Sequence, residues 1–183
     1  REFYGLYVAP EADGVLAESP VVEKQWTDYS QGTLTPTGNS LDLALSGSGF
    51  FVVNGPGGAL YTRHGGFQLS ATGTLETKEG YTVRAVGGAS IIVDPSRPVE
   101  IAPDGTVSQQ GTEAGRIEVV EVSDTSALAK RGGLYFHLDP QSKASVSASA
   151  SQVRQGSLES ANVGTAEAAV RMVSVMRQFE MLQ

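Results

Sequence analysis

The sequence LDLALSGSGFFVVNGPGGALYTR, residues 41–63, decides the fold class. Every second residue from Leu41 to Leu45 is leucine, which is the period of a β-strand with one buried face. The apolar run 50–53 follows a Gly-Ser-Gly segment, and the turn sequence Asn-Gly-Pro-Gly-Gly comes after it. The stretch therefore predicts consecutive antiparallel strands joined by tight turns.

Short apolar segments separated by turn residues continue to about residue 138. Glycine accounts for 22 of the 183 residues, and Asp-Pro and Asp-Gly pairs punctuate the segments. No alternation of strands with helices suggests a parallel sheet. We therefore expect a mainly β protein: a Gly-rich antiparallel β-domain, sandwich or barrel-like, followed by a C-terminal amphipathic α-helix.

Changes in composition predict four segments. Prolines and glycine interrupt the first apolar residues, and a run of Ala and Ser follows the last predicted strand of the β-domain. The expected segments are an irregular or extended lead-in at 1–40, the β-domain at 41–142, an Ala/Ser-rich connector with a short return strand at 143–161, and an assembly helix at 162–183.

The C-terminal segment has helical periodicity. Apolar residues recur at spacings of three and four, which places them on one face of a helix. An isolated helix of this length is marginal in water, so the face needs a partner. The residues alone leave open whether that partner is another helix or the protein's own β-domain. The predicted helix assembly interface is Ala169, Met172, Val173, Met176 and Phe179.

Charge and composition exclude several partners. The formal net charge is −7, whereas nucleic acids and anionic membrane surfaces require a basic face. The chain has no cysteine, and no apolar stretch approaches the ~20 residues that span a bilayer. No signal peptide is visible, and because the helical pattern runs to the last residue we expect the chain to be a fragment of a longer protein.

No pattern of catalytic or cofactor-binding residues is found. His64 and His137 are the only histidines and lack metal-ligand spacing, and no phosphate-binding loop or nucleophile elbow occurs. We therefore expect no enzyme, cofactor, metal or small-molecule substrate. The alternative is a β-sandwich module that binds a carbohydrate or a receptor through Trp26 and the six tyrosines, although their spread along strand-like segments favours packing.

An ordered series of motifs resembles the flagellar rod and hook family, the axial proteins of the bacterial flagellum. The resemblance covers about residues 28–183, and within the family residues 177–181 are most similar to proximal rod members, with distal rod members second. The motifs lie at 31–45, 47–53, 61–67, 73–75, 80–81, 103–107, 156–163 and 177–181. The family's first helix and the Asn-Leu-Ala-Asn-rich segment are absent from this sequence.

The resemblance implies a structural subunit of the basal-body rod. Terminal helices would form the axial core, with the β-domain outside it, in a rod that spans the periplasm. Its partners would be other copies of itself and neighbouring rod proteins, after type III export without a cleaved signal peptide. The motif residues with an implied structural role are Gly38, Asn39, Leu41, Asp42, Gly47, Gly49, Phe50, Phe51, Tyr61, Thr62, Arg63, Gly65, Phe67, Asp104, Gly105, Leu158, Glu159, Asn162 and Val163.

Overall fold

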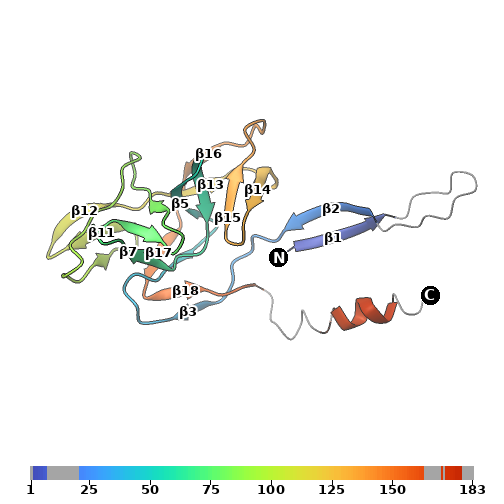
Figure 1. Ribbon diagram of the computed structural model, residues 1–183, viewed down its shortest axis with the longest axis horizontal. Coiled ribbons are helices and arrows are strands. Elements are labelled where there is room, and N and C mark those ends of the chain that lie inside the picture. Colours follow the sequence, from blue (N-terminus) through green and yellow to red (C-terminus); the bar gives the residue numbers. More distant parts are fainter. Residues whose placement is uncertain (1, 8–20, 163–169, 171, 179–183) are drawn as a thin grey trace, which may run out of the picture. The chain divides into compact units, whose positions relative to one another are not determined.

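The structure is a computed structural model that describes residues 2–7, 21–162, 170 and 172–178 (Figure 1). The chain forms two compact units. One contains residues 31–160 and is called the β-body below; the other combines residues 1–30 with 161–183. All strand pairs of the β-body are antiparallel, and within residues 31–160, all of which are described, no sheet closes into a barrel. The mainly β prediction is confirmed.

The largest sheet has nine strands in the order β14-β15-β6-β5-β9-β8-β7, with β13 joined to β5 and β16 joined to β13. Its centre is the β5–β6 hairpin, in which Val52 pairs with Tyr61 and Gly55 pairs with Gly58, as the deciding stretch predicts. A short 3-10 helix, Thr125–Ala127, links β13 to β14. The strands are β5 (Phe50–Gly55), β6 (Gly58–Thr62), β7 (Phe67–Leu69), β8 (Leu75–Thr77), β9 (Thr82–Val83), β13 (Val119–Val122), β14 (Leu128–Arg131), β15 (Tyr135–Leu138) and β16 (Val146–Ala148).

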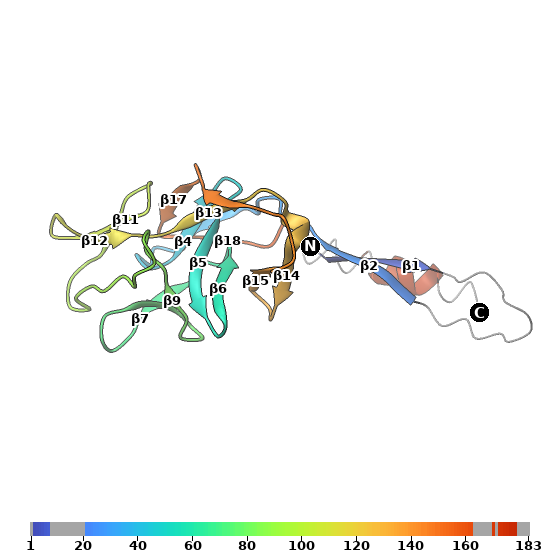
Figure 2. The ribbon, with the colours of Figure 1, turned by 90° about the horizontal axis from the view of Figure 1, so that it is seen from above.

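Three smaller sheets complete the β-body. Two of them pair a strand from its beginning with a strand from its end: β4 (Leu43–Ser46) with β17 (Gln152–Gln155), and β3 (Leu34–Pro36) with β18 (Ser157–Glu159). Both views show β11–β12 and β14–β15 at opposite ends of the β-body (Figure 1, Figure 2). The third sheet is β10 (Glu100–Ile101), β11 (Thr106–Gln109) and β12 (Thr112–Arg116).

The central strand β5 is buried on both faces. Phe50 packs edge-on against Phe136 at a ring-centroid distance of 6.2 Å, and Phe51 packs against Phe67 at 5.3 Å. Side chains that alternate along a strand point to opposite faces, so these two contacts show that both faces are covered. This explains why residues 50–53 form a continuous apolar run where a half-exposed strand would alternate.

The segment 1–40, predicted to be an irregular or extended lead-in, contains three strands. Strands β1 (Glu2–Tyr7) and β2 (Val21–Thr27) form an antiparallel pair, and β3 lies in the β-body. Pro10 and Pro20, which disfavour a helix here, lie between β1 and β2 in the sequence and so do not interrupt either strand. Likewise, the expected connector 143–161 contributes β16, β17 and β18, and all but its last residue lies within the β-body.

The described C-terminal residues 170 and 172–178 are helical, which confirms the predicted C-terminal helix (Figure 1). Among the residues that the structure describes, no helix has the length and apolar content needed to cross a membrane.

Candidate assembly site

The structure brings motif residues from distant parts of the sequence together around Arg63. Arg63 follows β6, and its Nε donates to Oε2 of Glu159, at the end of β18, at 2.9 Å. Nη2 of Arg63 lies 2.8 Å from the same oxygen, and the exposed fractions of the two side chains are only 14% and 9%. A charged pair this well covered must be held by further hydrogen bonds.

The glycine turn before β5 supplies part of that network. Nη1 of Arg63 donates to the carbonyls of Gly47 and Gly49, both at 2.8 Å. Gly47 has a φ of +131°, which favours glycine, and a Cβ at Gly49 would crowd Ser149 and Ser151. The Gly-Ser-Gly motif therefore serves to present two backbone carbonyls to the guanidinium group.

Glu159 also binds the segment that enters the β-body. Its Oε1 accepts a hydrogen bond from the backbone N–H of Gly32 at 2.8 Å. A Cβ at Gly32 would overlap the carbonyl oxygen of Ser160, so only glycine allows this close approach. Ser160 N–H in turn donates to the Thr33 carbonyl at 2.9 Å. We call Arg63, Glu159, Gly32, Gly47 and Gly49 the Arg63 clamp.

The loop at 37–42 makes a second attachment to the returning chain. The Gly156 carbonyl accepts from the Thr37 and Gly38 N–H groups at 2.8 and 3.2 Å, and Gly156 N–H donates to the Asp42 carbonyl at 2.8 Å. Asn39 shapes the loop, since its Oδ1 accepts from Leu41 N–H at 3.2 Å and its Nδ2 donates to Asp42 at 3.1 Å. These motif residues therefore hold one end of the β3–β18 ribbon, and the clamp holds the other.

Other motif residues pack the core. Phe50, Phe51, Tyr61 and Phe67 are buried, as is Thr62, whose hydroxyl donates to the Leu134 carbonyl at 2.7 Å. Gly65 lies against Leu43, where a Cβ would overlap the carbonyl oxygen, and Leu158 is half-buried in β18.

Asp104 and Gly105 form a turn between β10 and β11. The Asp104 carboxylate accepts from the Thr106 N–H at 3.0 Å and from its hydroxyl at 2.9 Å, and these hydrogen bonds lower the pKa of Asp104. Gly105 has a φ of +86°. The pair has turn geometry and does not join the Arg63 clamp.

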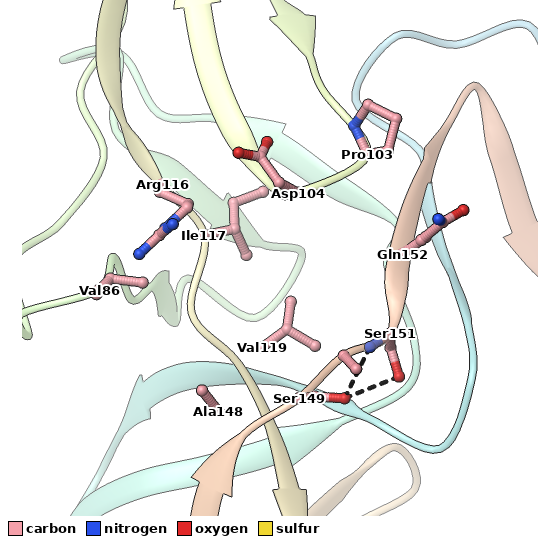
Figure 3. A pocket seen from close by; sticks show the side chains of 11 residues that line it. Val86, Pro103, Asp104, Arg116, Ile117, Val119, Ala148, Ser149, Ser151 and Gln152 are labelled. Atoms are coloured by element: carbon pink, nitrogen blue, oxygen red, sulfur yellow. Dashed lines mark hydrogen bonds between the residues drawn. The ribbon is translucent and has the colours of Figure 1, made fainter.

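Beside this turn lies an open hollow of about 490 Å³ (Figure 3). Asp104 and Arg116 contribute opposite charges to its lining, and Ser149 and Ser151 hydrogen-bond to each other at 2.8 Å. In the described part of the chain, no group of three or more His, Cys, Asp or Glu side chains is placed to hold a metal ion. The hollow therefore contains no such group.

Asn162 belongs to the second compact unit. Its Nδ2 lies 3.2 Å from the carbonyl oxygens of both Asp28 and Ser30 and 3.0 Å from the Ser30 hydroxyl, so the amide bridges the two chain segments of that unit. The neighbouring motif residue Val163 lies outside the described residues.

The C-terminal helix exposes its apolar side chains. The exposed fractions of Met172, Val173 and Met176, which were predicted to form the assembly interface, are 64%, 48% and 58%. Val170 and Val175 are also exposed. Ala169 and Phe179, the other members of the predicted interface, lie outside the described residues.

Two family models match parts of this chain. The family model for the flagellar hook protein FlgE/F/G D1 domain matches residues 44–109, and the model for the flagellar basal body rod FlgEFG protein C-terminal matches residues 154–183. The flagellar basal-body rod protein FlgF of Caulobacter vibrioides is 36% identical, over 84% of this chain and 62% of that protein. The chain belongs to the flagellar hook and basal-body rod family.

Other members of the family are similar over the same region. FlgF of Rhizobium meliloti is 29% identical over 86% of this chain and 66% of that protein, and the basal-body rod protein FlgG of Bacillus subtilis is 32% identical over 84% and 63%. The chain thus spans less than two thirds of the length of each relative. The ranking of FlgF before FlgG agrees with the order expected from residues 177–181.

Sequence reasoning identified Arg63 and Glu159 singly but did not pair them. They are 96 residues apart, and no local pattern links them. Gly32 was noted only as part of the motif at 31–45. An isolated glycine in an extended segment can mark a place where another backbone approaches closely, and this signal could have identified it.

Proposed function

We propose that the protein is a structural subunit of the flagellar basal-body rod, most similar to proximal rod proteins. The β-body is the rigid outer part of each subunit, and the C-terminal helix supplies contacts to other copies and to neighbouring rod proteins. The subunit works in the rod that crosses the periplasm, which it reaches by type III export without a cleaved signal peptide. The family membership supports this proposal.

The observation that carries the proposal is the exposed apolar surface of the helix. Met172 and Met176 lie one helical turn apart, and each is more than half exposed. Burial of a large apolar side chain contributes about 1.5–3 kcal/mol, so a partner helix that covers both residues gains a substantial free energy of association. Contacts of this kind that repeat with a rotation that does not close on itself generate a helical filament.

The test is complementation of a strain that lacks the gene, using the full-length protein with Met172→Asp and Met176→Asp. We expect the β-body to fold and rod completion and swimming to be lost, because two carboxylates would be buried in the helix contact. The matched control is Ser174→Asp with Gln178→Asp, which adds the same charge at the same spacing on the opposite side of the helix.

Rod completion is scored by isolation of basal bodies, and folding by urea unfolding of the purified protein. Normal rods with the Met172 and Met176 variant would count against the helix contact. Failure of the wild-type gene to restore rods would count against the proposed function as a whole.

A further inference from the structure

The β-body is joined to the rest of the chain at two places that lie side by side. The chain enters the β-body at residue 31 and leaves it at residue 160. Strand β3 follows the first crossing, β18 precedes the second, and the two strands pair with each other (Figure 1). A two-stranded ribbon is only marginally stable by itself, so this ribbon needs support from other parts of the β-body.

The Arg63 clamp supplies part of that support, beside the contacts that Gln31 makes with Leu45 and Gly47. Glu159 binds Gly32 beside the entry crossing, and Arg63 binds both Glu159 beside the exit crossing and the turn at Gly47 and Gly49 that leads into the central strand β5. Arg63 thus attaches the exit crossing directly, and the entry crossing through Glu159, to the turn that leads into the main sheet.

This arrangement requires the shape of arginine. A guanidinium group offers five N–H donors in a fixed plane, so it can reach a carboxylate and two carbonyls that lie in different directions. A lysine ammonium at the same position is a point charge on a flexible stem and cannot hold all three acceptors in one geometry.

Resting on the proposed function, we propose that Arg63 and Glu159 are positioning residues of each rod subunit. They hold the first and last segments of the β-body, on either side of the β3–β18 ribbon, against the turn at Gly47 and Gly49. A covered ion pair contributes little net stability by comparison with apolar packing. Its hydrogen bonds, however, require specific directions of the partner groups. The clamp holds the crossings rigid, and the core cluster around Phe51 and Leu43 holds the β-body folded.

The β-body contains a matched ion pair for comparison. Arg84 binds both carboxylate oxygens of Glu118 at 2.5 and 3.0 Å, with exposed fractions of 26% and 23%. This pair joins residues beside β9 and β13, and its two hydrogen bonds involve none of the clamp residues. Its loss should therefore leave the crossings as they are.

The experiment compares Glu159→Gln and Arg63→Lys with Glu118→Gln in the full chain. Hydrogen exchange is measured at Thr37 and Ser160, whose N–H groups bond across the paired segments, and at Val53 in the core. We expect exchange at Thr37 and Ser160 to accelerate at least about tenfold in the two clamp variants, and exchange at Val53 to change less than about twofold. Glu118→Gln should leave exchange at Thr37 and Ser160 unchanged.

The same variants are then introduced into the bacterium that makes the protein. We expect the clamp variants to be exported but to give few complete rods and poor swimming, and Glu118→Gln to behave as wild type. Normal rods in clamp variants whose exchange at Thr37 and Ser160 is faster would overturn the positioning role. Exchange at these residues that is no faster in the clamp variants than in the Glu118→Gln control would also overturn it. If Arg63→Lys does not fold, Glu159→Gln decides the result, because glutamine keeps the volume of the side chain. Failure of the wild-type gene to support rods would instead refute the proposed function.

Discussion

The side-chain amide of Gln155 donates to the Val99 carbonyl at 2.8 Å, and so joins β17 to the segment that leads into β10. The same Nε2 donates to the Ser40 carbonyl at 2.9 Å, and Oε1 accepts from Ile101 N–H at 3.1 Å. One half-buried amide therefore connects three segments that no apolar pattern in the sequence relates.

Gln155→Glu should destabilise the β-body by about 2–3 kcal/mol, because a carboxylate would face two carbonyls that lose their donor. The control is Gln152→Glu, the same substitution at an exposed position of the same strand, which should cost no more than about 0.5 kcal/mol. Urea unfolding of the two variants measures the difference. Equal unfolding midpoints would show that the amide bridge contributes nothing.

Tyr135 gives the protein a specific sensitivity to alkaline pH. Burial and the hydrogen bond that its hydroxyl donates to Glu79 raise the pKa of Tyr135 to about 12. Because the folded pKa exceeds the unfolded value near 10, the contribution of this group to stability is complete below about pH 10 and is lost as the pH rises through about 12. The same hydrogen bond lowers the pKa of Glu79. The contribution of Glu79 to stability is therefore lost as the pH falls and its carboxylate becomes protonated.

Tyr135→Phe should therefore flatten the fall in stability between about pH 10 and 12. Thermal unfolding at several pH values, with wild type and variant side by side, measures this. The control is Tyr81→Phe, which removes a hydroxyl from the other ring of the edge-to-face pair, 5.2 Å away. An unchanged alkaline slope in Tyr135→Phe would refute the assignment.

Much of the β-body follows from local pattern. The β5–β6 hairpin, strands β7 to β9 and the Asp104-Gly105 turn were expected, because apolar period and turn residues act over a few positions. Strands β12 and β14 were not expected. Most of their residues are exposed, so their sequences lack the alternation that marks a half-buried strand.

The site was predictable only in part. The motif residues were identified one by one, but the contacts of Arg63 join it to Gly32, Gly47 and Glu159, and the entry segment meets the exit segment across 127 residues of sequence. Pairings of this range depend on the whole topology, which short-range periodicity does not encode. The C-terminal helix was expected because the spacing of three and four residues between its apolar side chains is a local pattern that can be read from the sequence alone.

Gly65 tests how tightly the motif between β6 and β7 is packed. It is buried, and a Cβ would overlap the Leu43 carbonyl oxygen and approach the Phe51 ring to 3.1 Å. Gly65→Ala should therefore destabilise the β-body by about 1–3 kcal/mol, because backbone cannot move aside as a flexible side chain can. Gly133→Ala is the control, since nothing lies within 4 Å of its Cβ position. Urea unfolding should give a clearly lower midpoint for Gly65→Ala alone, and equal midpoints would mean that β4 and the 65–66 turn separate at little cost.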